Sequence, residues 1–172
     1  MREASERRTA TDTDSYAFSF INQSNANEGT TAADFCRMRD NLSNALKLIE
    51  EYNQLYNTSF KALPPYRLFP GDDGDYEFKN QQWPGNEHAG VYLILSRTGE
   101  VIYVGQSLSF GSRFYQYFRN EGGKCIILSD NWSAMPYAIV AIQAPDEKKY
   151  ERLSLEEYLI QNLLPIDNVR GK

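Results

Sequence analysis

Histidine, cysteine and long apolar runs are scarce in this chain of 172 residues. Cys36 and Cys125 are far apart and lack the spacing of metal ligands, so we expect two free thiols in a reducing compartment. The single histidine, His88, is either an exposed loop residue or a proton carrier for a nearby site. No segment approaches the roughly 20 apolar residues of a membrane helix, and the first residues lack the apolar stretch of a signal peptide. We therefore expect a cytoplasmic protein without a membrane partner.

An excess of positive charge is also missing. Eighteen lysines and arginines face twenty-three acidic residues, for a net charge of −5. That balance is not typical of a protein that binds nucleic acid without specificity. Residues 1–85 hold nine basic and thirteen acidic side chains, whereas residues 86–172 hold nine and ten. Any contact of the second half with nucleic acid would therefore depend on a local basic patch.

The first half of the chain is predicted to be an extension of the second. Residues 1–30 are too polar to offset the entropy of ordering, which predicts a flexible arm. From residue 31 to about 57, apolar residues recur three and four apart, as in an amphipathic helix. This helix would pack on the rest of the chain or on a second subunit, which leaves open a homodimer. Together with a turn-rich connector it makes up residues 31–85.

Residues 86–170 are predicted to form the main domain. Two short apolar runs separated by a turn indicate a β-hairpin, and a later run rich in β-branched residues indicates a third strand. Helical spacing between and after them completes the order β-β-α-β-α. The expected fold class is α+β, a three-stranded antiparallel sheet flanked by helices, with an N-terminal helical extension. We expect the strands at residues 91–95, 101–104 and 135–142, and the helices at residues 110–120 and 146–164.

Two tripeptides mark the hairpin. Gly90-Val91-Tyr92 is followed, after ten residues, by Tyr103-Val104-Gly105. Arg113 and Tyr117 then lie one turn apart on one face of the next predicted helix. These residues resemble the signature of the GIY-YIG nuclease superfamily, and within it the N-terminal nuclease domain of the bacterial excision-repair endonuclease. The resemblance covers the C-terminal half of the chain.

The last predicted helix extends the resemblance, because Glu156 stands where the family carries its metal-binding glutamate and Asn168 follows Pro165. The resemblance implies a nuclease that cuts a nucleic acid, which we expect to be DNA, with one Mg²⁺ or Mn²⁺ ion held by Glu156. Glu157 is adjacent, so only one of the two glutamates can face the sheet, and the family spacing selects Glu156. The guanidinium fork of Arg113 suits a phosphate.

The tyrosines fill the remaining catalytic roles that the resemblance implies. Either Tyr92 or Tyr103 would take a proton from water, and we favour Tyr92 as the base with Tyr103 orienting the water. Because the ordinary pKa of tyrosine is about 10, the site would have to favour the phenolate through nearby cations. Tyr117 would relay the proton or bind phosphate. Gly90, Gly105 and Asn168 are expected to support the site.

Weaker expectations concern contacts with the substrate. Gln106 follows Gly105 where the repair nuclease carries a lysine, so one cationic contact is missing there. Basic residues could form a strip along the phosphates, although isolated basic residues on helices more often face solvent. The candidates are Arg113, Arg119, Lys124, Lys148, Lys149 and Arg152.

Two classes of function remain open. The first is a metal-dependent endonuclease with a restriction-type, mobile-element or toxin role, of which the restriction type fits a compact chain with its own helical extension. The second is a module that keeps the fold and binds nucleic acid or a partner without catalysis. Loss of cleavage on replacing Glu156 would separate them.

Overall fold

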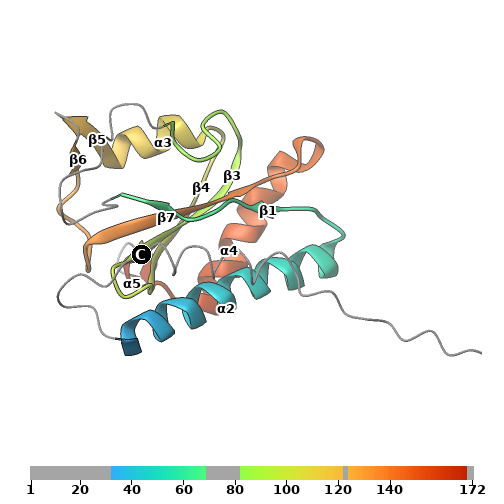
Figure 1. Cartoon of the computed structure of the whole chain (residues 1–172). Coiled ribbons are helices and arrows are strands. Elements are labelled where there is room, and N and C mark those ends of the chain that lie inside the picture. The colour runs from blue at the N-terminus through green and yellow to red at the C-terminus, as the bar shows by residue number, and fades with distance from the viewer. Residues whose placement is uncertain (1–31, 69–81, 122–123, 170–172) are drawn as a thin grey trace, which may run out of the picture.

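An antiparallel sheet forms the centre of the molecule (Figure 1). The computed structural model describes residues 32–68, 82–121 and 124–169. Strand β3 is central, because it pairs with β4 on one side and with β7 on the other, and all of its residues are buried. The three long strands confirm the predicted antiparallel sheet. They are β3 (Gly90–Ser96), β4 (Val101–Ser107) and β7 (Pro136–Gln143).

The sheet contains five strands rather than the three expected. Two short strands, β1 (Lys61–Ala62) and β2 (Tyr66–Arg67), pair with the outer edge of β7. They lie in the segment predicted to be a connector. Each contains two residues, which is too short to show the alternation of apolar and polar side chains that marks a strand.

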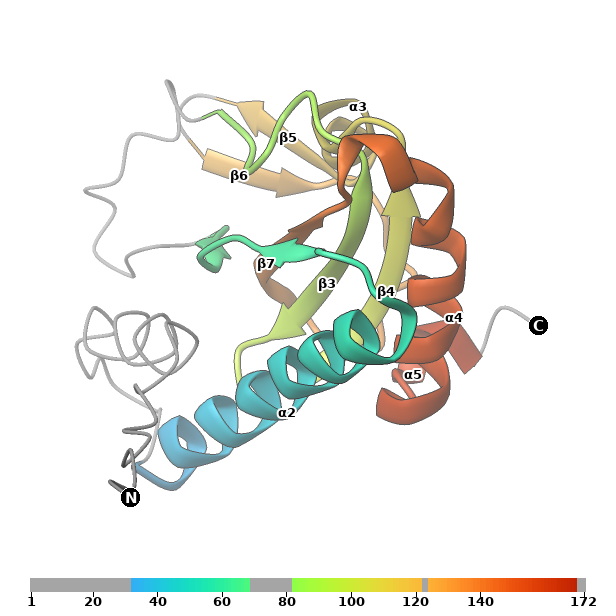
Figure 2. The same cartoon turned by 90° about the vertical axis from the view of Figure 1, so that its right-hand side faces the viewer.

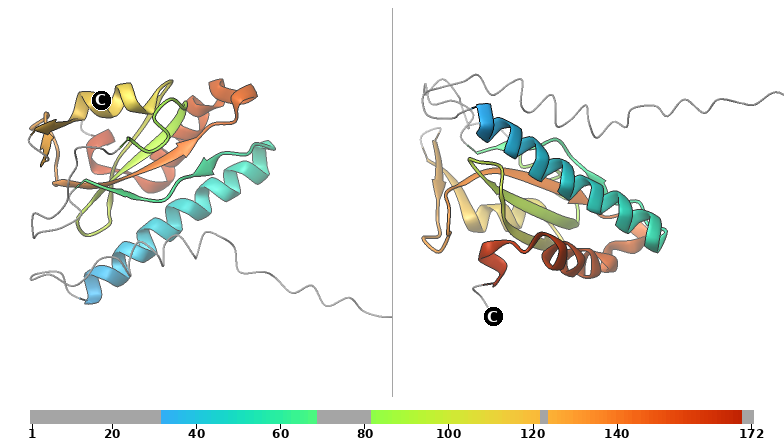
Figure 3. Two further views of the ribbon diagram at one scale, coloured as in Figure 1. Left: turned by 45° about the horizontal axis from the view of Figure 1, so that its top comes forward. Right: turned by 90° about the horizontal axis from the view of Figure 1, so that it is seen from below.

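The N-terminal extension contributes one long helix, α2 (Ala32–Tyr56), which crosses the sheet diagonally (Figures 2 and 3). Its apolar stripe packs against β3, β7 and the C-terminal helix, with Leu42, Leu46 and Ile49 buried in one shared core cluster. Full burial of such a side chain contributes about 1.5–3 kcal/mol, which holds the helix on its own chain. The same contacts leave this stripe unavailable to a second subunit, so they do not support a homodimer formed through it.

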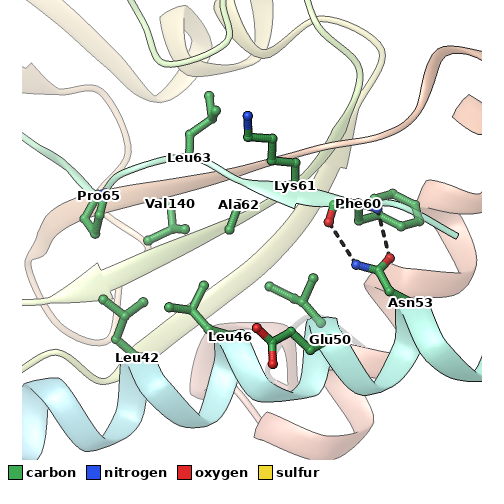
Figure 4. Close-up of a pocket in the computed structure, with 11 residues that line it drawn as sticks. Leu42, Leu46, Glu50, Asn53, Phe60, Lys61, Ala62, Leu63, Pro65 and Val140 are labelled. Carbon is green, nitrogen blue, oxygen red and sulfur yellow. Dashed lines mark hydrogen bonds between the residues drawn. The ribbon is translucent and has the colours of Figure 1, made fainter. Parts of the chain in front are cut away.

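The turn after α2 is fixed by one asparagine. The Asn53 amide donates to the carbonyl oxygen of Phe60 at 2.9 Å and accepts from the Phe60 amide at 2.9 Å (Figure 4). Both polar groups of a main-chain residue are therefore satisfied by a single side chain. This contact directs the chain from the end of the helix into β1.

The opposite face of the sheet is covered by α3 (Phe110–Tyr117) and a separate hairpin of β5 (Phe118–Glu121) and β6 (Lys124–Ile127) (Figure 1). The helix was expected to reach residue 120. It ends earlier because Phe118 adopts an extended conformation, with φ −137° and ψ 138°, and starts β5. Its side chain remains buried beside Phe114 in a second core cluster.

The last predicted helix divides into two. Residues Asp146–Glu151 form a 3₁₀ helix, η2, in which Lys148 departs from helical geometry, and α4 follows at Arg152–Leu163. A left-handed residue, Leu164, ends α4, and the short helix α5 (Ile166–Val169) follows. Among the described helices, none has the length and apolar character needed to cross a membrane.

Strand β4 is clamped along its outer edge by α5. The side-chain oxygen of Asn168 accepts from the amide of Val104 at 2.7 Å, and its side-chain nitrogen donates to the carbonyl oxygen of Val104 at 2.8 Å. An unpaired edge strand would expose both groups. The asparagine therefore replaces a neighbouring strand at the residue between Tyr103 and Gly105.

We predict that Asn168→Ala lowers the free energy of unfolding by about 1–3 kcal/mol, because it leaves two polar groups of β4 without their partner. Urea denaturation followed by circular dichroism measures this change. Asn162→Ala is the matched control, since that amide donates to the Tyr158 carbonyl oxygen on the exposed side of α4. The control should change stability by less than about 0.5 kcal/mol. Equal effects of the two variants would contradict the role given to the clamp.

A second prediction concerns Cys125, a buried free cysteine on β6. Burial raises the pKa of its thiol from 9.0 to about 11. The unfolded chain therefore ionises at lower pH than the folded one, so this residue's contribution to stability is intact below about pH 9 and is lost as the pH rises toward 11. In a Cys36→Ser background, Ellman's reagent should react slowly with the folded protein at pH 8 and rapidly after denaturation. Equal rates in the two states would show that the thiol is accessible.

Candidate active site

Three tyrosines from three different elements meet on the α3 side of the sheet. Tyr92 lies on β3, Tyr103 on β4 and Tyr117 at the end of α3. The ring centroids of Tyr92 and Tyr103 are 6.1 Å apart, and each lies 6.3 Å from that of Tyr117. The hydroxyl groups of Tyr92 and Tyr117 are hydrogen-bonded at 3.2 Å. The structure thus brings together the three tyrosines singled out in the sequence.

Gly105 makes room for this cluster. It is the residue of β4 that pairs directly with Tyr92. A β-carbon at Gly105 would lie 2.5 Å from Cζ of Tyr92 and 2.7 Å from the ring of Tyr103, closer than atoms can approach. The absence of a side chain therefore lets the Tyr92 ring cross the neighbouring strand. Gly90 has a similar role at the start of β3, where a β-carbon would lie 2.9 Å from the ring of Phe110.

The hydrogen-bonding register also helps to place Tyr103. It shifts between Ile94 and Leu95, so that Ile102 has no partner in the ladder. Residues Ile102 and Tyr103 then pack against the same core cluster although they are adjacent in sequence. A regular strand would point them to opposite faces. The irregularity allows an apolar core residue and a polar site residue to follow one another.

Burial keeps the hydroxyls of Tyr92 and Tyr103 protonated. Burial is the main reason that the pKa of Tyr92 lies above its usual value, and the neighbouring Tyr117 raises it further. The pKa of Tyr103 is raised by burial, by Tyr117 and by the negative charge of Glu156. The charge of Arg113 lowers the pKa of both tyrosines. At neutral pH the hydroxyls are therefore uncharged, and an additional cation would be needed to favour a phenolate.

Arg113 lies one turn before Tyr117 on α3 and is half-buried. Its guanidinium donates to the neutral side chain of Gln116 at 2.9 Å. Within the described residues no carboxylate forms an ion pair with it. Its charge therefore remains available to an anion, while it acts on both Tyr92 and Glu156 through space.

Glu156 is the half-buried glutamate of α4, whereas Glu157 is exposed and accepts a hydrogen bond from Gln161 at 2.9 Å. Burial, and then the charge of Glu157, raise the pKa of Glu156, while a backbone hydrogen bond with Gln106 and the charges of Arg113 and Arg152 lower it. A carboxylate that has lost much of its hydration gains strongly from a nearby cation. Of the two adjacent glutamates, Glu156 is the one with the surroundings of a metal ligand.

The residues present fit a metal ion that needs few protein ligands. In the described ranges there is no group of three or more His, Cys, Asp or Glu side chains arranged to hold an ion. Mg²⁺ commonly binds through one or two carboxylates and takes its other ligands from water and substrate. The single, partly desolvated Glu156 is compatible with that mode of binding.

Trp132 and its supports were missed by the sequence analysis. The Trp132 ring contacts Tyr103 and Tyr117 edge to face, with centroids 5.8 and 5.5 Å away. The neighbouring Ser133 is held by Asp167, which accepts from its amide at 3.1 Å and from its hydroxyl. No motif or periodicity marks this loop, so only the folded chain reveals that α5 supports a wall of the tyrosine cluster.

Other predicted residues are less closely joined to the cluster. Arg119 is exposed and paired with Glu121. Lys124 lies on β6, but its side chain is outside the described part. His88 is exposed between a turn and the start of β3. Of the proposed basic strip, Lys148 and Lys149 form ion pairs with Glu151 and Asp146.

Gln106, expected as a weak substrate contact, is engaged within the protein. Its side-chain oxygen accepts from Nε of Arg152 at 2.7 Å. Its amide nitrogen takes no part in this bond, and a contact with substrate stays a prediction.

A cavity of about 290 Å³ lies between α2 and the segment around β1 (Figure 4). Leu42, Leu46 and Val140 contribute to its apolar lining, with Glu50 and Lys61 among the polar residues. It borders the core cluster formed with α2, whereas the tyrosines belong to the other cluster. None of the residues predicted for the active site lines this cavity.

Comparison with known proteins agrees with this geometry. The family described as the GIY-YIG catalytic domain matches residues 88–169. Among similar proteins, UvrABC system protein C of Clostridium novyi is 34% identical over 98 residues, which are 55% of this chain and 14% of that protein. UvrABC system protein C of Nitrosomonas europaea is 35% identical over 81 residues, which are 46% of this chain and 13% of that protein.

The chain therefore spans only about a seventh of the length of the relatives that it matches. The match, the sheet and the cluster of tyrosines with Arg113 and Glu156 agree on one assignment. Residues 88–169 of this chain are a GIY-YIG domain.

Proposed function

We propose that this protein is an endonuclease that hydrolyses a phosphodiester bond of DNA with one Mg²⁺ or Mn²⁺ ion. The observation that carries the proposal is the convergence of Arg113, Glu156 and three tyrosines from four separate elements. The charge of Arg113 lowers the pKa of Tyr92, of Tyr103 and of Glu156, which supports a single site. A cation, a carboxylate and proton-carrying hydroxyls are the groups that phosphodiester hydrolysis requires.

Arg113 has the task of holding the scissile phosphate. Negative charge grows on the phosphate oxygens as the nucleophile adds, and a guanidinium can donate two parallel hydrogen bonds to them. Its bond to neutral Gln116 orients the side chain without cancelling its charge. A lysine would supply the charge but not the planar pair of donors.

Glu156 would hold the metal ion. When bound, the ion supplies positive charge that stabilises the leaving 3′ oxygen. The carboxylate is prepared for this task by partial burial, and the backbone of Gln106 helps to keep it ionised. Glu156 thereby also determines where the leaving group must lie relative to Arg113.

The tyrosines would manage the proton of the attacking water. Tyr92, as a phenolate, would accept the proton while the water oxygen forms its bond to phosphorus and the bond from phosphorus to the 3′ oxygen breaks with its electron pair. Tyr103 would orient the water. The hydroxyl of Tyr117, bonded to that of Tyr92, would pass the accepted proton to solvent, and the 3′ oxygen would take up a proton from solvent.

The biological role is proposed more coarsely. We propose a restriction-type role in the cytoplasm, which is compatible with an extension that packs on the GIY-YIG domain. The matching relatives are about seven times longer than the shared region, so a role in excision repair does not transfer with the chemistry. Because α2 buries its stripe internally, its proposed contribution is support of the sheet rather than dimerisation.

We predict that Glu156→Gln and Arg113→Ala each reduce cleavage of supercoiled plasmid in Mg²⁺ by at least about 100-fold, since each removes a charge that acts on the transition state. Glu157→Gln and Lys47→Ala are controls for charge, since Lys47 is an exposed lysine of α2 that pairs with Glu51, and we expect both to cut within about threefold of the unaltered protein. Gel densitometry measures the rates, and circular dichroism verifies folding. Inactivity of the unaltered protein on double-stranded DNA, single-stranded DNA and RNA would favour a binding module without catalysis.

A further prediction concerns pH. Because the pKa of Tyr92 is raised, the phenolate fraction, and with it the cleavage rate, should increase about tenfold per pH unit from pH 6 to 9. Tyr92→Phe should lower the rate by about 10²–10⁴-fold and remove this dependence. Tyr103→Phe should lower the rate but retain its dependence on pH. The exposed Tyr115 provides a control, because Tyr115→Phe should change neither the cleavage rate nor its dependence on pH. Loss of the dependence in Tyr103→Phe alone would make Tyr103 the base.

A further inference from the structure

Arg152 lies beside the proposed active site although no motif marks it. It is the first residue of α4 and stands four residues before Glu156, which puts both side chains on one face of the helix. Its charge is among those that lower the pKa of Glu156. A cation therefore lies close to the carboxylate on the α4 side, in addition to Arg113 on α3.

Gln106 couples Arg152 to Glu156. The side-chain oxygen of Gln106 accepts from Nε of Arg152 at 2.7 Å, and its backbone forms a hydrogen bond with the carboxylate of Glu156. A second bond runs from Nη1 of Arg152 to the carbonyl oxygen of Lys149 at 2.7 Å. The guanidinium is thus held in place by neutral acceptors at the end of β4.

The absence of a carboxylate partner distinguishes Arg152 from other cations nearby in the sequence. Lys148 pairs with Glu151, and Lys149 pairs with Asp146 at 2.9 Å. Among the described residues, Arg152 forms no such pair, and Arg113 resembles it in this respect. Two arginines with uncompensated charge therefore flank a single half-buried glutamate.

Helix electrostatics also argue against a purely structural role. Arg152 occupies the first turn of α4, where the partial charge of the helix is positive and a cation is unfavourable. The hydrogen bonds to Gln106 and Lys149 offset part of this cost but do not neutralise the charge. An anion beside Arg152 would interact favourably with both the guanidinium and the helix end.

We propose that Arg152 is a second phosphate-binding arginine of this site, held by Gln106 and contacting the nucleic-acid backbone on the Glu156 side. This inference rests on the proposed nuclease function and deepens it. It assigns to α4 the cationic contact that the glutamine at position 106 does not provide. Arg113 on α3 and Arg152 on α4 then contact the substrate from two different elements, while Glu156 holds the metal ion.

The first test measures plasmid cleavage by Arg152→Ala, Arg152→Lys and the control Lys47→Ala, which changes an exposed lysine of α2 that pairs with Glu51. We expect kcat/KM to fall about 100-fold for the alanine variant and less for the lysine variant, which keeps the charge but loses the fork. Lys47→Ala should remain within about threefold of the unaltered protein. The melting temperature of Arg152→Ala should change by less than about 4 °C, because the half-buried side chain occupies an unfavourable helix position.

A compensating variant separates substrate binding from local structure. In Gln106→Lys/Arg152→Ala a new ammonium group stands at the end of β4, and we expect it to recover at least about tenfold of the lost activity. A role of Arg152 in merely orienting Gln106 predicts the opposite, since the glutamine is removed as well. No recovery, together with equal activity of Gln106→Ala and Arg152→Ala, would overturn phosphate contact in favour of positioning.

The salt dependence of binding tests the inference without cleavage. A short fluorescein-labelled DNA duplex is titrated in EDTA, and the slope of log K against log salt concentration is compared. Loss of one phosphate contact should reduce the slope by roughly 0.9 for Arg152→Ala, whereas Lys47→Ala should leave the slope unchanged. If the unaltered protein cuts but Arg152→Ala keeps both activity and slope, this inference fails and the nuclease function stands. If nothing is cut, the nuclease function fails, and an unchanged slope overturns this inference as well.

Discussion

The missing side chain at Gly105 is the constraint on which the site depends. Because Gly105 pairs directly with Tyr92, any β-carbon there would occupy the space of the tyrosine ring. The ring instead crosses β4, and its hydroxyl reaches that of Tyr117 at the end of α3. That helix also carries Arg113, one turn before Tyr117. The missing side chain at Gly105 thus lets Tyr92 reach the helix that carries the arginine.

Several ionisable groups of the site lie in electrostatically unfavourable surroundings. Burial opposes ionisation of Tyr92, Tyr103 and Glu156, while Arg113 and Arg152 have no carboxylate partner among the described residues. Each of these states would be relieved by a bound cation or phosphate. The rest of the fold tolerates them because predominantly apolar clusters cover both faces of the sheet. Complementarity to a charged substrate is therefore built in before the substrate arrives, as expected of a preorganised site.

The features of the molecule that were predictable are those that produce a local pattern in the sequence. The β3–β4 hairpin follows from two apolar runs around a turn, and Glu156 was distinguished from Glu157 by its spacing within the family motif. Features that depend on distant contacts were not predictable in this way. Strands β1 and β2 are too short to show an alternation of apolar and polar residues. Trp132 joins the site from a loop that is held by the bond between Ser133 and Asp167, 34 residues away. The bond between Arg152 and Gln106 likewise joins residues 46 apart.

The pairing of β1 with β7 has a consequence for how the protein is made. Residues 61 and 62 can pair with β7 only after residues 142 and 143 have been made, about 80 residues later. At about 5–20 residues per second, that interval lasts roughly 4–16 seconds. Glu156 is translated later still, after every tyrosine of the cluster. A nascent chain that has not yet reached residue 156 therefore lacks the carboxylate of the proposed site, so the order of translation delays completion of that site until after the strands of the sheet have been made.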